Sequence, residues 1–221
     1  MVQKSIIIDF DHTIGYFEQI IFIINIIEVT YRVKLKKEQL HILFKCFPFI
    51  FRPKLFDILK LVLYLQKDEK IVFFILYTRN TQPHFVEAVV SFMESTLNFH
   101  PLFQFKLFEK TKIKRIETIH DEIKNNIHSH VLCFIDNTFF PCYNQNKETK
   151  YIKCETYIYD YKVKDILALF PYYMFKGINE NILHDYIRHK KRNKSRKKGL
   201  PYQLYELNSV FVYQSISDFV S

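Results

Sequence analysis

Three short runs of apolar residues, each ending in polar side chains, recur along the chain. They occupy residues 4–10 (KSIIIDF), 70–78 (KIVFFILYT) and 130–137 (HVLCFIDN). A continuous apolar run of this length is typical of a strand that is buried on both faces, as in a parallel sheet. Because the carboxyl ends of parallel strands lie at one edge of the sheet, we expect the polar residues at these three ends to lie together.

Segments with helical periodicity separate these runs. Apolar residues three or four positions apart predict helices over 54–66, 83–97 and 112–127. The alternation predicts an α/β fold: a doubly wound, Rossmann-like parallel sheet with helices on both faces. A fourth strand is predicted over 151–159, followed by helices over 165–175 and 179–188.

Residues 16–47 interrupt this alternation after the first predicted strand. Their pattern predicts two helices, over 17–27 and 36–47. The pair could form a small cap over the crevice or a helical layer beside the sheet. The layer is favoured because the segment is short and has no glycine hinge, so we expect a small helical insertion and no large cap.

The positive charge of the chain is concentrated in one segment. The net charge is +9, from 32 Lys and Arg against 23 Asp and Glu. Eight of the basic residues lie in residues 188–198, which begin at Arg188 and end at Lys198, so the other 24 nearly balance the acids. We therefore expect a domain over 1–176 and a basic extension over 177–221. The run could be a solvated charge cluster, a nuclear address or a contact for nucleic acid or another polyanion.

Composition excludes several classes of function. The three glycines are scattered, which excludes the two common glycine-rich nucleotide-binding motifs. The four cysteines form no C-x-x-C pair, which indicates reduced thiols in an intracellular protein, cytoplasmic or nuclear. The densest apolar stretch, 20–27, is too short to span a membrane, so no membrane association is expected. Enrichment in Ile, Lys, Phe, Tyr and Asn is typical of an AT-rich, virus-like genome.

The first strand ends in a pair of acids, Asp9 and Asp11. Two carboxylates at a strand end suit a hard cation such as Mg²⁺, which takes oxygen ligands and commonly uses one or two carboxylates. Alternatively, the acids could simply end the strand and cap the next helix.

The stretch IIIDFDHTI at 6–14 resembles the D-x-D-x-T motif of the haloacid dehalogenase superfamily of aspartate-based phosphotransferases. Three further motifs follow in the order of that family. Thr78 stands at the end of the second run, Lys114 precedes the third, and the pair Asp136 and Asn137 ends it.

Within that superfamily, the chain is similar to the small phosphatases that act on the C-terminal domain of RNA polymerase II and related phosphoproteins, the NLI-interacting-factor-like branch. The stretches FRPKLFDIL at 51–59 and VKDILALFP at 163–171 carry this likeness, together with the Asp-Asn pair. It spans roughly residues 4–172. The chain departs from the branch in the helical pattern after the first motif, in Arg79 where the branch has a small residue, and in the basic run.

The resemblance implies roles for four catalytic residues. Asp9 would attack phosphorus and form an aspartyl-phosphate. Asp11 would protonate the leaving oxygen and then activate water. Thr78 and Lys114 would bind phosphoryl oxygens. Lys110 and Lys112 are alternatives to Lys114.

The resemblance also implies a Mg²⁺ site and two accessory residues. Asp9, Asn137 and the backbone carbonyl of Asp11 would hold the ion, and Asp136 would orient its shell. Thr13 could contact phosphate, support the first motif or cap a helix. Arg79 could bind a second anionic group of the substrate or form a surface ion pair.

The expected function is a Mg²⁺-dependent phosphomonoester hydrolase, a protein Ser/Thr phosphatase acting on a phosphoprotein or phosphopeptide. The basic run favours one alternative, a phosphatase that processes nucleic-acid ends. A second alternative is an inert scaffold of the same fold, against which the complete set of motif residues argues.

Overall fold

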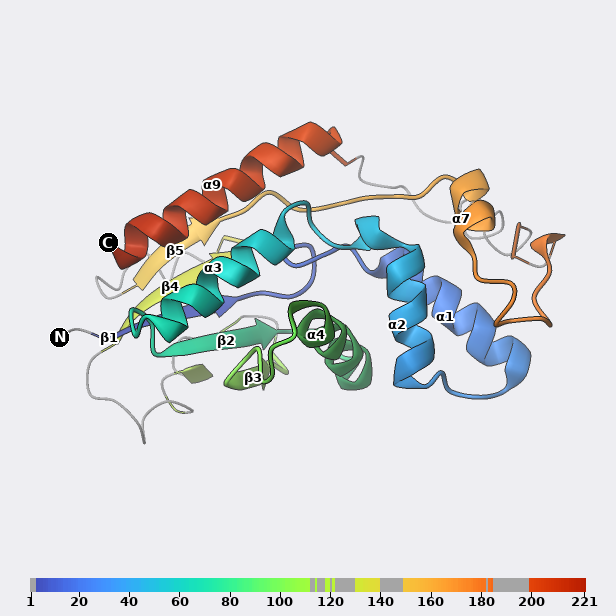
Figure 1. Cartoon of the computed structure of the whole chain (residues 1–221), viewed down its shortest axis with the longest axis horizontal. Coiled ribbons are helices and arrows are strands. Elements are labelled where there is room, and N and C mark those ends of the chain that lie inside the picture. Colours follow the sequence, from blue (N-terminus) through green and yellow to red (C-terminus); the bar gives the residue numbers. More distant parts are fainter. Residues whose placement is uncertain are drawn as a thin grey trace.

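The chain forms a five-stranded, all-parallel sheet with helices packed on it (Figure 1). The computed structural model describes residues 3–111, 114, 118–119, 121, 130–139, 149–181, 183–184 and 199–221. The strands, in the spatial order β3-β2-β1-β4-β5, are β1 (Gln3–Ile8), β2 (Phe73–Thr78), β3 (Phe105–Phe108), β4 (His130–Asp136) and β5 (Thr149–Lys153). The predicted α/β, doubly wound fold is confirmed.

The register of the central strands aligns their carboxyl ends. Ile8 of β1 pairs with Leu76 of β2 on one side and with Ile135 of β4 on the other. The backbone N–H of Asp9 then donates to the carbonyl of Ile135 at 2.9 Å. The polar residues that follow these strands therefore start from the same edge of the sheet.

Alternate residues of the central strands are buried on opposite faces of the sheet. On one face, Ile6 and Ile8 belong to a large apolar cluster with the helices α3 (Leu55–Lys67), α4 (Pro83–Leu97) and α9 (Tyr202–Val220). On the other face, Ile7 belongs to a second cluster that includes Ile119. This burial on both faces explains why the central strands are continuous apolar runs.

The insertion after β1 forms α1 (Glu18–Tyr31), α2 (Lys37–Cys46) and the short 3₁₀ helix η1 (Pro48–Ile50). The rings of Phe44 in α2 and Phe92 in α4 meet edge to face, with centroids 5.5 Å apart. Figure 1 shows α1 and α2 beyond the carboxyl ends of the strands, beside α4. The insertion therefore extends the helical layer past the sheet.

Several elements differ from the prediction. The strand expected over 151–159 is β5 and ends at Lys153, and the helix expected over 165–175 is α7 (Val163–Leu169), which ends before Pro171. The edge strand β3 and the long helix α9 were not predicted. Most of the helix expected over 112–127, the end of that over 179–188 and the basic run at 188–198 lie outside the described residues.

The carboxyl-terminal part of the chain contributes to the core. Val212, Ile216 and Phe219 of α9 are buried in the large cluster, and α9 packs on α3, β4 and β5. The domain boundary placed at residue 176 stays a prediction, and the core extends past it. Across the described ranges, no helix has the length and apolar character needed to cross a membrane.

Candidate active site

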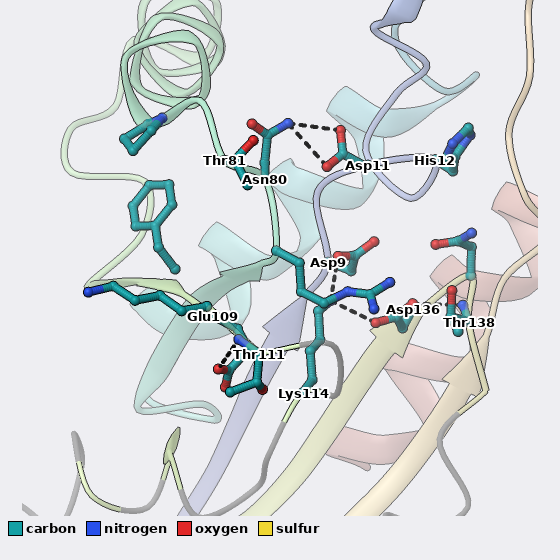
Figure 2. A pocket seen from close by; sticks show the side chains of 15 residues that line it. Asp9, Asp11, His12, Asn80, Thr81, Glu109, Thr111, Lys114, Asp136 and Thr138 are labelled. Carbon is teal, nitrogen blue, oxygen red and sulfur yellow. Dashed lines mark hydrogen bonds and ion pairs between the residues drawn. The ribbon is translucent and has the colours of Figure 1, made fainter.

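A cavity of about 710 Å³ lies at the carboxyl edge of the sheet (Figure 2). The residues that line it lie at the ends of β1, β2, β3 and β4 or beyond them: Asp9, Asp11, His12, Arg79, Asn80, Thr81, Pro83, Phe108, Glu109, Lys110, Thr111, Lys114, Asp136, Asn137 and Thr138. All of them lie outside the insertion at 16–47. Neither α1 nor α2 contributes to the lining, so the cap considered for this insertion is not formed by these helices.

Asp9 is buried and fixed at both carboxylate oxygens. Its exposed fraction is 6%, and its Oδ2 accepts a hydrogen bond of 2.9 Å from the Thr13 hydroxyl. Its Oδ1 forms an ion pair with the Lys114 ammonium group. The Thr13 oxygen in turn accepts a hydrogen bond from the backbone N–H of Asn137 at 3.1 Å. Thr13, a candidate phosphate contact from the sequence, does not line the cavity and instead supports Asp9.

Lys114 joins the ends of β1 and β4. Its exposed fraction is 1%, and its ammonium group contacts both Asp9 and Asp136, the latter at 2.8 Å. The same group lies 5.5 Å from the ring centre of Tyr77 and 5.6 Å from that of Phe134, within the range of cation–π attraction. A buried ammonium group needs such partners, since an unpaired charge at this depth is costly.

The position of Lys114 bears on the choice among three candidate lysines. Lys110 lines the same cavity but is exposed, and Lys112 lies outside the described residues. Of the two that the structure describes, Lys114 contacts the Asp9 carboxylate.

Asp136 is the last residue of β4, and Asn137 follows it directly. The Asp136 Oδ1 accepts a hydrogen bond of 2.7 Å from the backbone N–H of Thr138. Burial and the nearby Asp9 charge raise the pKa of Asp136 to about 6, against the opposing effect of Lys114. The side-chain nitrogen of Asn137 donates to the Thr156 hydroxyl at 3.3 Å, and its amide oxygen lies 3.2 Å from the Thr13 hydroxyl oxygen.

Asp11 has a separate partner. The amide nitrogen of Asn80 lies 3.1 Å from each of its carboxylate oxygens. Figure 2 shows Asp11 turned toward Asn80, away from the group formed by Asp9, Lys114 and Asp136. Burial raises the pKa of Asp11, and the negative charge of Asp9 raises it further. The two acids of the first motif therefore have different environments.

Thr78, the last residue of β2, and Arg79, the next residue, have different positions. Thr78 is fully buried, and its hydroxyl accepts a hydrogen bond of 3.0 Å from the backbone N–H of Asn80. It is not among the residues that line the cavity, so its predicted contact with phosphate stays a prediction. Arg79 is exposed and lines the cavity.

The loop that carries the first motif is held by Arg52. Its buried guanidinium group donates to the carbonyl oxygens of Thr13 at 2.6 Å, His12 at 2.9 Å and Glu155 at 2.5 Å. His12 has a φ of 62°, a left-handed conformation that costs energy in most residues and is fixed here by these contacts. Sequence reasoning placed Arg52 in a family-like stretch but assigned no role to it, nor to Asn80.

The cavity offers oxygen donors of the kind that Mg²⁺ takes. Among the described residues, no group of three or more His, Cys, Asp or Glu side chains could hold a metal ion. The predicted ligands do not need such a group, because Mg²⁺ commonly uses one or two carboxylates together with other oxygens and water. The carboxylates of Asp9 and Asp136 share one cationic partner, the ammonium group of Lys114.

Comparison with protein-family models, with curated proteins and with solved structures finds no match for this chain. The phosphatase hypothesis therefore depends on the motif resemblance and on the geometry of the cavity.

Proposed function

We propose that this chain is a Mg²⁺-dependent phosphomonoester hydrolase that works through an aspartyl-phosphate on Asp9, and that it acts on phosphoserine or phosphothreonine in proteins. The observation that carries the proposal is the arrangement of Asp9, Lys114 and Asp136 beside a separately held Asp11, all in one cavity. A nucleophile, a cation for phosphoryl oxygens and an independent acid are the groups that such a reaction needs.

In the first step, an Asp9 carboxylate oxygen bonds to phosphorus while the ester bond to the leaving oxygen breaks. Thr13 holds one Asp9 oxygen, which keeps the carboxylate oriented in the cavity. Lys114 offsets negative charge on the phosphoryl oxygens as the transition state forms. Asp11 donates its proton to the departing oxygen, and its raised pKa favours the protonated form that this step requires.

In the second step, Asp11 acts as a base. Having lost its proton, it accepts one from a water molecule that attacks phosphorus, and the bond to Asp9 breaks. Inorganic phosphate is released, and both carboxyl groups return to their starting state. Asn80 holds Asp11 throughout, because its amide contacts both oxygens of the carboxylate.

Asp9, Asn137 and the backbone carbonyl of Asp11 would hold Mg²⁺, with Asp136 orienting its water ligands. The ion would reduce the repulsion between the anionic nucleophile and the anionic substrate.

The proposed substrate class follows from the shape of the cavity. Its described lining comes from the strand ends and the loops after them, with no contribution from α1 or α2. A cavity of about 710 Å³ whose described lining has no residue of α1 or α2 suits a phosphorylated side chain presented by an extended peptide. The alternative, a phosphorylated nucleic-acid end, is favoured by the basic run at 188–198 and by Arg79 and Lys110 in the lining.

The test measures phosphate release in the presence of Mg²⁺ from three substrates: a phosphoserine peptide, a 5′-phosphorylated oligonucleotide and an aryl phosphate. We expect release from the peptide and the aryl phosphate. Asp9→Asn keeps the shape of the side chain and removes its charge, so we expect less than about 1% of the wild-type activity. A beryllium fluoride adduct should form on Asp9.

Release from the oligonucleotide alone would favour the alternative function. Release from none of the substrates, or an adduct on another side chain, would contradict the proposal.

A further inference from the structure

Helix α9 is apolar on two opposite sides. Tyr205, Val212 and Ile216 face the core. Leu204 and Leu207 are 46% and 65% exposed, and Phe211 is 54% exposed. At about 100° per residue, the second set points away from the first. The outer side of the helix therefore presents a row of large apolar side chains.

The spacing of these outer residues matches a helix-packing face. Leu204, Leu207 and Phe211 are three and four positions apart, the spacing by which one helix packs against another. Val210 and Tyr213, which are also exposed, widen the row toward α3. Isolated apolar residues are common on protein surfaces, but a contiguous group of this size indicates an interface.

A groove of about 550 Å³ runs between α3 and α9, which lie side by side in Figure 1. Its apolar lining includes Leu61 and Tyr64 of α3 with Val210 and Tyr213 of α9. Lys54, Asp57 and Lys60 stand on its α3 side, two basic residues and one acid. The groove thus offers an apolar floor with a margin of net positive charge, which suits an amphipathic helix that carries acids.

The charge of α9 is complementary to that margin. Between Tyr202 and Val220 the helix carries Glu206 and Asp218 but no Lys or Arg, although the whole chain has a net charge of +9. On α3 and its N-cap, Lys54, Lys60 and Lys67 are exposed against one exposed acid, Asp57, a net positive charge. Helix α9 is therefore complementary to the groove in both apolar pattern and net charge.

We propose that a second copy of this chain occupies the groove. Each α9 lies in the α3–α9 groove of the other copy, so both copies use the same surface for the contact. Such an isologous contact has two-fold symmetry and closes at two copies. The inference does not depend on the proposed function, since the groove shares no lining residue with the cavity at the strand ends.

The test measures the mass of the full chain in solution, by sedimentation velocity over about 1–100 μM, because dimerisation depends on concentration. We expect a dimer, with twice the 26.9 kDa of one chain. Leu207→Glu and Phe211→Glu each place a charge in the contact and should give monomers. Lys60→Glu reverses a charge on the groove margin and should raise the dissociation constant at least tenfold.

Val29→Glu is the matched control. Val29 is 71% exposed on α1, outside the groove, so this variant should dimerise as the wild type does. A wild-type chain that is monomeric at every concentration would overturn the proposal, whatever the variants do. So would a dimer that withstands both α9 substitutions in folded variants, or one that Val29→Glu disrupts equally. Binding of a different protein to a monomeric chain would likewise assign the groove to another occupant.

Discussion

The side-chain nitrogen of Asn80 lies 3.1 Å from each carboxylate oxygen of Asp11. The orientation of this amide is fixed, because its oxygen accepts a hydrogen bond of 2.8 Å from the backbone N–H of Gln82. The backbone N–H of Asn80 also donates to Thr78 at the end of β2. Asn80 therefore links Asp11, the proposed acid after β1, to the end of the neighbouring strand β2.

We predict that Asn80→Ala slows phosphate transfer from substrates with poor leaving groups. Without its partner, Asp11 is free to rotate, and misplacing a reacting group by about 1 Å can cost about 100-fold in rate. Turnover of phenyl phosphate should fall about 10- to 100-fold. Turnover of 2,4-dinitrophenyl phosphate, whose leaving group needs no proton, should change little.

The matched control for this prediction is Thr81→Ala, which lies in the same loop and lines the same cavity. It should leave both rates near those of the wild type. An equal loss on both substrates in Asn80→Ala would mean that the residue acts on the fold or on binding rather than on the acid.

The raised pKa of Asp11 predicts a pH dependence that differs between leaving groups. Burial raises this pKa, as does the charge of Asp9. As pH rises through the raised value, Asp11 loses the proton that a poor leaving group needs. The ratio of kcat/KM for phenyl phosphate to that for 2,4-dinitrophenyl phosphate should therefore fall with increasing pH. In Asp11→Asn, this ratio should be low and independent of pH, and a falling ratio in that variant would contradict the role of Asp11.

Removing the charge of Lys114 should destabilise the fold. In Lys114→Met, the buried Asp9 and Asp136 carboxylates lose their shared cation. Breaking a buried ion pair at one partner typically costs about 3–5 kcal/mol. Urea unfolding should show a loss of this order in the free energy of unfolding near pH 8. The control is Lys106→Met, whose exposed pair with Glu87 should contribute less than about 1 kcal/mol.

The same variant should recover part of its stability in acid. Burial and the charge of Asp9 raise the folded-state pKa of Asp136, and the loss of Lys114 removes the charge that opposes this rise above the unfolded value of about 3.9. The cost is complete at pH values above the raised pKa and decreases as Asp136 becomes protonated. The difference from the wild type should therefore be smaller at pH 5 than at pH 8, and an equal or larger difference at pH 5 would contradict this account.

Arg52 should be irreplaceable by lysine. Its guanidinium group donates to carbonyl oxygens in the segments after β1 and β5, those of Thr13 and Glu155 among them, and to the Asn208 side chain at 3.1 Å. An ammonium group cannot reach these acceptors in the same fork geometry. Arg52→Lys should lower the free energy of unfolding by about 2–4 kcal/mol, as expected for buried charged hydrogen bonds left unmade. Arg32→Lys, at an exposed position, should leave it unchanged.

The central strands could be predicted because they are buried on both faces. β1, β2 and β4 lie inside the sheet, so their sequences are continuous apolar runs. β3 lies at the edge, has four residues and exposes Lys106, so its sequence resembles that of a loop. Helix α9 was not predicted because it has apolar residues on two sides. Helical periodicity is recognised from the contrast between one apolar side and one polar side, and this contrast is weak in α9.

The candidate site could be predicted in part for a similar reason. Asp9, Asp136 and Asn137 stand at the ends of predicted strands, and parallel strands bring their carboxyl ends together. The partners of these residues come from distant positions. Arg52 is 39 residues from Thr13, and Asn80 is 69 residues from Asp11. No local periodicity encodes such contacts, which arise only when the chain is folded.

The basic run at 188–198, outside the described residues, should act in recruitment and not in the chemistry. It contains eight Lys and Arg residues and accounts for nearly all of the net charge of +9. Replacing these eight residues with Gln should leave the hydrolysis of a small aryl phosphate unchanged, because such a substrate needs only the cavity. Binding to single-stranded DNA should fall sharply, and binding by the wild type should weaken steeply with salt, since neutralised phosphates release counterions.

The activity of the Gln variant distinguishes two roles of the basic run. If the Gln variant lowers small-substrate turnover tenfold, equal to about 1.4 kcal/mol of activation free energy, the run contributes to the active site. Recruitment and chemistry would then share one surface. If turnover is kept and only DNA binding is lost, the charge serves to concentrate the enzyme on a polyanion. Measuring both quantities on the same preparation, with circular dichroism to verify folding, distinguishes these results.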